Sequence, residues 1–272
     1  MDGSAPPAAA VRNVCFAFGR SEVLHNVSFE LPPRCFAAVI GPNGGGKTTL
    51  LRLLLGELKP RFGSVEVLGR RPAQARSDVG FVPQSAAFDS DFPVSVREVA
   101  ALGCRCGAFG GISARDRERA DRALEKVGLK DFGDKPFGAL SGGQRQRAMV
   151  AQAIAGEPKL LLLDEPTANV DPETEGALYD LFAEMSLGAA VVMVSHDRDV
   201  VSRRATHLLC VNRGADLHDL GESGDHEAVL EPIAGHDRAR IRNEHPAHVE
   251  ELCDHAGRTP HLGEGQASPA PD

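Results

Sequence analysis

The sequence predicts an α/β protein with a parallel, layered core, an antiparallel sheet at one edge and an inserted helical lobe. Three observations lead to this class. Short apolar strand-like runs alternate with helical patterns, which is typical of parallel sheets covered by helices. A glycine-rich loop joins the apolar run at residues 35–40 to a helical segment. Between about Phe88 and Gly138 charged helical patterns replace the apolar runs, which indicates the inserted lobe.

The elements before the lobe follow from local patterns. Residues 11–31 alternate between apolar and polar types with turn residues between them, as expected for an antiparallel edge sheet. Residues 35–40 are short and wholly apolar, as in a buried strand. A helix is predicted over residues 48–58, because a proline follows at position 60. Further short strands are expected to begin at Val65 and Val79.

The second half repeats the strand and helix rhythm. The charge run that begins at Ala114 is interpreted as the solvated face of a helix with i,i+4 ion pairs. Residues 159–163 and 189–194 are predicted buried strands. Beyond about residue 231 large apolar residues become rare. We therefore expect one domain over residues 11–231, with its lobe at about 88–138, and a disordered tail over residues 232–272.

Composition limits the classes of partner. The 272 residues carry a formal net charge of −8, with no Trp and one Tyr, which argues against nucleic acid. No apolar stretch reaches the roughly 18 residues that a membrane span needs. The amino-terminal residues lack the basic and apolar regions of a signal peptide. We expect a cytosolic chain that would need another subunit to act in a membrane.

The six cysteines are scattered and form no Cys-x-x-Cys pair. Cys15, Cys35 and Cys210 lie in apolar strand-like runs, where free thiols behave as small hydrophobic side chains. Cys104 and Cys106 form a cluster, but their spacing is not typical of a zinc site. A redox or metal role for this cluster is the alternative to a structural one.

The loop at residues 41–48 reads Gly-Pro-Asn-Gly-Gly-Gly-Lys-Thr and matches the phosphate-binding pattern G-x-x-x-x-G-K-[ST]. Its glycines allow backbone amides to wrap phosphates, and the following helix contributes its positive end. Lys47 is expected to reach the β- and γ-phosphates, and the Thr48 hydroxyl to ligate Mg²⁺. The alternative is a chance glycine-rich turn, which the correct placement of Lys and Thr between a strand and a helix disfavours.

Two carboxylates, Asp164 and Glu165, end the apolar run at residues 160–163. The carboxyl end of a buried parallel strand lies beside the phosphate-binding loop, where ligands bind in such sheets. Asp164 therefore suits a contact with Mg²⁺, and Glu165 suits the general base that polarises an attacking water. Without the loop, two solvated acids at a strand end would be the better interpretation.

Two more polar residues close neighbouring strands. His196 follows the run at residues 189–194, where it could reach the γ-phosphate or the water, although a lone His is usually structural. Gln84 ends the strand that begins at Val79, and its amide could ligate Mg²⁺ or water. We therefore predict catalytic roles for Glu165, His196 and Gln84, and Mg²⁺ contacts for Thr48, Gln84 and Asp164.

Residues 140–144 read Leu-Ser-Gly-Gly-Gln, a motif that few phosphate-binding proteins carry. With the features above, it makes the chain resemble the ATP-binding subunit of an ABC transporter, from about Val11 to about Leu230. The resemblance implies a RecA-like core with ATP and Mg²⁺ as cofactors. It also implies a head-to-tail dimer of two copies, in which Ser141 and Gly143 face the γ-phosphate held by Lys47 of the other chain.

The family pattern extends to individual positions. Phe18 matches the aromatic residue that stacks on adenine, usually Tyr in this family, and Asp171 matches the acid that contacts the second copy. Gln152 and Asn169 depart from the pattern but remove no phosphate or metal ligand. The nucleotide-binding residues expected from the motifs and the resemblance are Phe18, Gly41, Pro42, Asn43, Gly44, Gly45, Gly46, Lys47, Thr48, Thr49, Ser141, Gly142, Gly143 and Gln144.

A narrower resemblance follows Gln84. Asp89, Asp91, Phe92 and Pro93 match an Asp-x-Asp-Phe-Pro pattern found in ATP-binding subunits of zinc, manganese and iron(II) importers. In that family the segment faces the membrane subunit. The resemblance implies integral-membrane permease subunits as partners and, indirectly, a metal-binding extracytoplasmic protein. It also implies a peripheral location on the cytoplasmic face of the cell membrane and import of zinc or manganese.

Alternatives remain open at this stage. The chain could serve an importer of another substrate, or be a soluble ABC ATPase of repair, translation or cofactor assembly. Such soluble proteins usually carry a coiled-coil insertion or two cassettes, which this sequence lacks. A regulator without turnover is disfavoured by Glu165 and His196. The tail holds His236, His245, His248, His255 and His261, so it is either a metal-sensing segment or a polar end that happens to be rich in His.

Overall fold

A computed structural model describes residues 5–84, 93–104, 111–167, 170–195, 204–221, 230–232 and 239–241. Its centre is a six-stranded sheet in the order β5-β6-β7-β3-β8-β9. The strands are β3 (Cys35–Ile40), β5 (Val79–Val82), β6 (Leu160–Asp164), β7 (Ala190–Val194), β8 (His207–Asn212) and β9 (Gly214–Asp219). All neighbours pair in parallel except β8 and β9. The predicted α/β class is confirmed.

The parallel register sets the position of the site. In β6 and β7, Asp164 lies opposite Val194, and in β3 and β7, Val39 also lies opposite Val194. The carboxyl ends of these three strands therefore meet at one edge of the sheet. The phosphate-binding loop leaves β3 at this edge, so the loop is brought close to Asp164, the last residue of β6, and to Glu165, which follows it.

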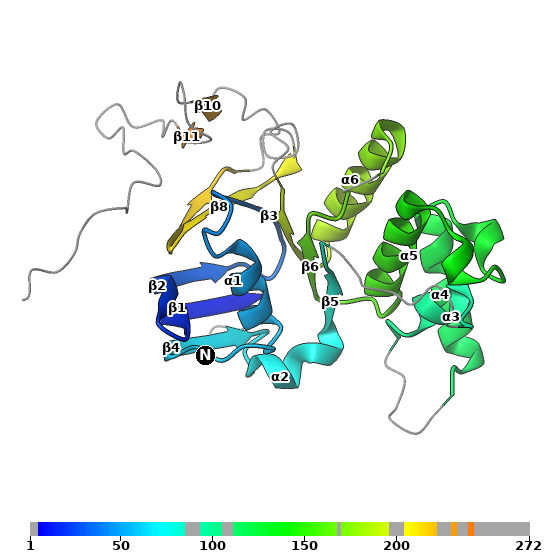
Figure 1. Cartoon of the computed structure of the whole chain (residues 1–272), viewed down its shortest axis with the longest axis horizontal. Coiled ribbons are helices and arrows are strands. Elements are labelled where there is room, and N and C mark those ends of the chain that lie inside the picture. Colours follow the sequence, from blue (N-terminus) through cyan, green and yellow to red (C-terminus); the bar gives the residue numbers. More distant parts are fainter. Residues whose placement is uncertain are drawn as a thin grey trace, which may run out of the picture.

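The antiparallel sheet has the order β2-β1-β4 and consists of β1 (Ala9–Phe18), β2 (Ser21–Leu31) and β4 (Phe62–Val67). β1 begins two residues before the expected start of the domain at residue 11. The apolar residues of this sheet pack with α1 (Lys47–Leu54) and one face of the central sheet. Figure 1 shows α1 beside β1 and β2, close to β3.

Helix α1 ends at Leu54, four residues earlier than the sequence predicts. Gly56 has a φ of +67° and terminates the helix in the left-handed conformation. The amide of Glu57 then donates a 3.0 Å hydrogen bond to the carbonyl of Arg52, which satisfies one of the last carbonyls of the helix. The glycine, rather than the proline at position 60, therefore sets the helix end.

The helical lobe packs on the opposite face of the central sheet. It contains α3 (Val96–Ala101), α4 (Ala114–Lys126) and α5 (Gly142–Ala155), each begun by a serine in a reciprocal capping box. α5 packs on α3 and α4, so the lobe's apolar core extends beyond residue 138. Figure 1 shows this lobe and the antiparallel sheet on opposite sides of the central sheet.

The remaining elements are short or peripheral. α6 (Pro172–Ser186) packs with β7, and α2 (Pro72–Ala75) lies next to β4. Short 3₁₀ helices occur at Arg76–Asp78, Lys130–Phe132 and Phe137–Ala139. β10 (Leu230–Pro232) pairs with β11 (Ala239–Ile241) across the expected domain boundary at residue 231. No helix in the described part of the chain combines the length and apolarity needed to cross a membrane.

Several expectations fall on residues outside the described ranges. These are His196, Asn169, Asp89, Asp91, Phe92, Cys106 and the His residues of the tail. Among the described cysteines, Cys35, Cys104 and Cys210 are buried. Burial raises the pKa of the Cys35 thiol to about 12, as expected for an inert core residue. Cys15 differs from the expectation, because it is only partly buried.

Candidate functional site

A cleft of about 620 Å³ lies at the edge where β3, β6 and β7 end. It is bounded by the phosphate-binding loop and α1 on one side and by the ends of β5 and β6 on the other. Its lining residues are Phe18, Val23, Asn43, Gly44, Gly46, Lys47, Thr48, Thr49, Gln84, Asp164, Glu165 and Val194.

The loop depends on close backbone packing behind the cleft. Gly41 has a φ of +147°, and a Cβ atom there would lie 1.9 Å from the carbonyl oxygen of Val211. A Cβ atom at Gly45 would lie 2.9 Å from the same oxygen. The amide of Arg213 donates a 3.0 Å hydrogen bond to the Gly45 carbonyl. Only glycine permits this approach, so the turn between β8 and β9 supports the loop from behind.

Lys47 begins α1 and is only 8% exposed. Its ammonium donates hydrogen bonds to the carbonyls of Gly41 at 2.8 Å and Pro42 at 3.1 Å. Burial lowers the pKa of Lys47, while the nearby charges of Glu165 and Asp164 oppose this shift. The loop carbonyls thus hold the partly desolvated Lys47 ammonium against the loop, where it is available to an anionic ligand.

Asp164 is 3% exposed at the end of β6. Burial raises its pKa, whereas a hydrogen bond with the Thr48 side chain acts in the opposite direction. Thr48, Asp164 and Gln84 all line the cleft and offer a hydroxyl, a carboxylate and an amide. Oxygen donors of these types match the preference of Mg²⁺. The predicted metal-contacting residues are therefore gathered in one place.

Glu165 has a φ of +50°, unusual for a residue with a side chain, and its amide donates a 3.2 Å hydrogen bond to the Val194 carbonyl. Its carboxylate accepts a 2.8 Å hydrogen bond from the Gln84 amide. This backbone conformation costs on the order of 1–3 kcal/mol and is typical of functional sites. It turns the chain sharply after β6, while Asp164 remains in the buried strand.

Phe18, at the end of β1, is 52% exposed and forms one end of the cleft. Its ring packs edge-to-face against Phe16, with centroids 4.9 Å apart and an interplanar angle of 85°. Phe16 holds the ring in place, and Phe18 retains an exposed aromatic surface. The arrangement suits stacking on a planar base.

The Leu-Ser-Gly-Gly-Gln motif does not belong to the described lining of the cleft. Ser141 caps α5 in the helical lobe, where its hydroxyl accepts a hydrogen bond from the backbone amide of Gln144. The Gln144 side chain accepts one from the Ser141 amide in return. Gly142 begins α5, and a Cβ atom there would meet no described atom within 4 Å. The motif thus forms the start of α5 with open space at Gly142, and it is not part of its own chain's cleft.

Sequence reasoning missed three contributors to the site. Val23 and Val194 line the cleft, and Arg213 supports the loop through its backbone. Apolar strand residues and a backbone contact carry no distinctive sequence pattern, so nothing in the sequence marks them.

Asp171, which the sequence singles out, caps α6, where its side chain accepts a hydrogen bond from the backbone amide of Thr174 at 3.0 Å.

Comparison with known proteins agrees with this geometry. Residues 24–168 match the family model described as ABC transporter. The zinc uptake system ATP-binding protein ZurA of Listeria monocytogenes is 39% identical over 210 residues, which cover 75% of this chain and 82% of that protein. A Chlamydia pneumoniae protein assigned as a metal transport system ATP-binding protein is 39% identical over 190 residues, or 68% and 78% of the two chains.

Solved structures show the same fold. A protein assigned as a metal-chelate type ABC transporter, in an inward-facing conformation, matches with a TM-score of 0.68 and 32% identity over 78% of this chain and 83% of that one. A dimeric ATP-binding cassette in a post-hydrolysis state with ADP and phosphate matches with a TM-score of 0.67 and 26% identity over 78% and 98%. The chain therefore belongs to the ABC transporter family, as one of its ATP-hydrolysing, ATP-binding subunits.

Proposed function

We propose that the cleft binds ATP with Mg²⁺ and that each residue lining it has a distinct role. Phe18 stacks on adenine, and the loop amides and Lys47 hold the phosphates. Thr48, Asp164 and Gln84 would hold Mg²⁺, which neutralises charge on the phosphates when bound. Glu165 accepts a proton from the attacking water, and Gln84 orients its carboxylate through the 2.8 Å hydrogen bond. His196 is proposed to assist at the γ-phosphate.

The site is proposed to be complete only when two chains associate head to tail. The supporting observation is the position of the Ser141–Gln144 motif, which lies outside the described lining of its own chain's cleft. The motif forms the start of α5, and a helix start attracts phosphate through its backbone amides and positive end. In the dimer, Ser141 and Gly143 of one chain would face the γ-phosphate held by Lys47 of the other.

Mixed dimers test this arrangement. Lys47→Ala disables the phosphate-binding loop, and Ser141→Arg blocks the motif. Each variant alone has two damaged sites and should be inactive. Mixing them in a membrane complex creates one doubly damaged site and one intact site, so ATPase activity should return. If the motif served its own chain, each polypeptide would be disabled by itself and mixing would restore nothing.

We further propose that residues 11–231 form the catalytic domain of a metal importer, with zinc or manganese as its cargo. Two relatives are described as ATP-binding proteins of zinc uptake and metal transport systems, and the segment after Gln84 resembles that of such importers. The chain would lie on the cytoplasmic face of the membrane against permease subunits. Closure of the ATP-bound dimer would drive the permease, and a metal-binding extracytoplasmic protein would deliver the ion.

Reconstitution with the cognate permease in vesicles tests the cargo. ATP supplied on the side of this chain should drive uptake of radioactive zinc or manganese into vesicles oriented for import, and Lys47→Ala should abolish it. ATP turnover without transport of either metal would contradict the proposed cargo and leave the ATPase site intact.

A further inference from the structure

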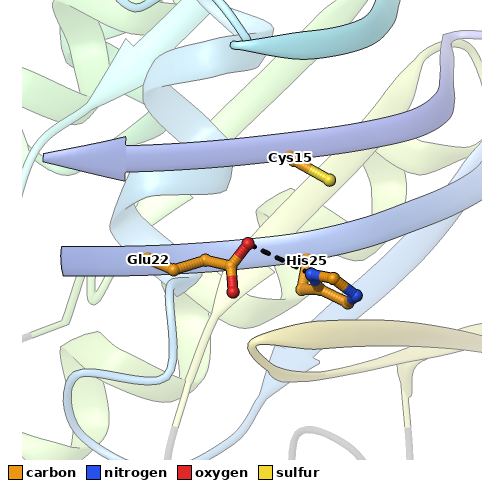
Figure 2. A group of neighbouring side chains, drawn as sticks. All are labelled: Cys15, Glu22 and His25. Atoms are coloured by element: carbon orange, nitrogen blue, oxygen red, sulfur yellow. Dashed lines mark hydrogen bonds and ion pairs between the residues drawn. The ribbon is translucent and has the colours of Figure 1, made fainter. Parts of the chain in front are cut away.

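A second group of metal-ligating side chains lies on the antiparallel sheet. The side chains of Cys15, Glu22 and His25 each offer one ligand atom, and these atoms all lie within 4.8 Å of one another. Figure 2 shows the thiol extending from β1 toward the His25 ring on β2, with the Glu22 carboxylate beside that ring and joined to it by the dashed line. These residues are not among those that line the nucleotide cleft.

An irregular strand pairing creates this convergence. Val14 pairs with Val27 and Phe16 with Leu24, so Cys15 alone faces two residues of β2, His25 and Asn26. Two residues opposite one define a β-bulge, which redirects side chains and frees backbone groups from the ladder. The bulge thus brings His25 next to the thiol.

Glu22 reaches the same position from the next part of the ladder. It pairs with Ala17, which lies two residues from Cys15 and therefore on the same face of β1. The small side chain of Ala17 leaves space for the carboxylate. The His25 Nδ1 and Glu22 Oε1 atoms are 3.1 Å apart. An exposed ion pair such as His25 and Glu22 contributes little to the stability of the fold. Stability alone therefore does not explain why the Cys15 thiol lies beside this pair.

Backbone contacts fix the position of the Cys15 sulfur. The amide of Asn26, which the bulge releases from the ladder, donates a 3.2 Å hydrogen bond to the Cys15 sulfur. Hydrogen bonds of this kind, made by groups outside the ligand set, orient metal ligands. The Cys15 carbonyl is also fixed, because it accepts a 2.8 Å hydrogen bond from the Arg61 amide.

We propose that Cys15, Glu22 and His25 bind a divalent ion of the zinc class. Thiolate, imidazole and carboxylate are the three zinc ligand types, and three protein ligands with a water form an open tetrahedral site. Tetrahedral zinc requires ligand atoms roughly 3.2–3.8 Å apart. The His25 and Glu22 side chains are 68% and 53% exposed, so both can make this small adjustment. Thiolate and imidazole disfavour Mg²⁺ and Mn²⁺.

The position of this site separates it from the nucleotide. Val23, which lies between Glu22 and His25 on β2, lines the cleft, whereas none of the three proposed ligands does. An ion bound here should coexist with Mg²⁺ and nucleotide. The site also requires neither a permease nor metal transport, so its test is independent of the proposed cargo.

Cobalt(II), which takes zinc sites and reports on thiolate ligation, tests the proposal in the full-length chain. Co²⁺ should produce a thiolate-to-metal charge-transfer band that zinc displaces and that persists with Mg²⁺ and a non-hydrolysable ATP analogue. Cys15→Ser should remove the band, and the matched control Cys253→Ser should leave it. Thiolate ligation that survives Cys15→Ser, or no band in the wild type, would overturn the site.

A second, milder variant, His25→Gln, is tested by calorimetry with Zn²⁺. His25→Gln changes an exposed side chain and should leave the circular dichroism spectrum and nucleotide affinity unchanged. It should weaken the Cys15-dependent binding by more than about tenfold, since loss of even an outer-shell partner costs that much. The control His248→Gln should not affect this binding. Equal zinc affinity in wild type and His25→Gln would exclude the proposed ligand set.

Discussion

The side-chain amide of Gln84 donates a 2.8 Å hydrogen bond to the carboxylate of Glu165, joining the ends of β5 and β6. These strands are parallel neighbours, with Val82 opposite Leu163, so both residues emerge at the same edge. Gln84 directly precedes the segment whose sequence resembles the permease-facing part of metal importers. The hydrogen bond therefore provides a physical connection between that segment and the proposed catalytic base.

Gln84→Ala tests this connection. Loss of the hydrogen bond and of a proposed Mg²⁺ contact should lower kcat by about tenfold to a hundredfold, because the base is misplaced. ATP affinity should change little, since Lys47 and the loop remain. Gln74→Ala, an exposed glutamine in α2, is the matched control. A normal kcat in a folded Gln84→Ala protein would contradict the role.

Phe18→Ala tests the proposed adenine contact. Base stacking on an aromatic ring contributes about 1–3 kcal/mol, so the Kd for ATP should rise about 5- to 150-fold. Phe18→Tyr keeps the aromatic face and should bind ATP as wild type does. Inorganic triphosphate has no base and should bind equally to all three proteins. Fluorescence titration measures these affinities, and an unchanged Kd for ATP in Phe18→Ala would refute the contact.

Asp164 predicts a specific dependence of stability on pH. Burial raises its pKa, so in the folded state the carboxylate is disfavoured relative to the unfolded state. As pH rises through the interval between the ordinary and the raised pKa, this group reduces the free energy of unfolding. Without nucleotide, Asp164→Asn should therefore be more stable than wild type above this interval.

Denaturant titrations over a pH series measure this difference, which should vanish below the ordinary carboxylate pKa. Mg²⁺ with ATP should then stabilise wild type more than Asp164→Asn, because only wild type retains the proposed carboxylate contact. A variant that is less stable at neutral pH without ligand would contradict the desolvation argument.

A substitution at Gly142 tests whether the start of α5 contacts a second chain in the ATP-bound dimer. An added side chain there meets no described atom of its own chain within 4 Å, and Asp suits the first turn of a helix. Gly142→Asp should therefore keep its thermal midpoint and its ATP affinity as a monomer. ATP hydrolysis should fall to background, because the carboxylate would repel the partner's bound phosphates.

The matched control is Gly111→Asp, which adds the same charge at another open, exposed position just before α4 of the lobe. It should retain full ATPase activity. Wild-type turnover in Gly142→Asp would show that the motif does not approach a nucleotide.

Local sequence patterns predicted much of the fold because burial and backbone conformation within one element depend on the residues of that element. The buried strands at residues 35–40 and 160–163 are wholly apolar, and the loop motif carries its own backbone requirements. The support for the loop could not be predicted, because Val211 and Arg213 act through backbone atoms that any residue has. The bulge opposite Cys15 was equally hidden, since strand alternation does not reveal a register shift. The proposed role of the Leu-Ser-Gly-Gly-Gln motif depends on a second chain, and periodicity within one sequence carries no information about such a contact.

The most direct test of the composite site is the oligomeric state of Glu165→Gln in Mg²⁺ and ATP, measured by gel filtration with light scattering. Loss of the base should reduce turnover by about 10²- to 10⁴-fold and trap the ATP-bound form. The account predicts a dimer that forms with ATP, dissociates without it, and is abolished by adding Ser141→Arg. A protein that stays monomeric at high concentration with Mg²⁺ and ATP, with and without its permease, would contradict the head-to-tail site.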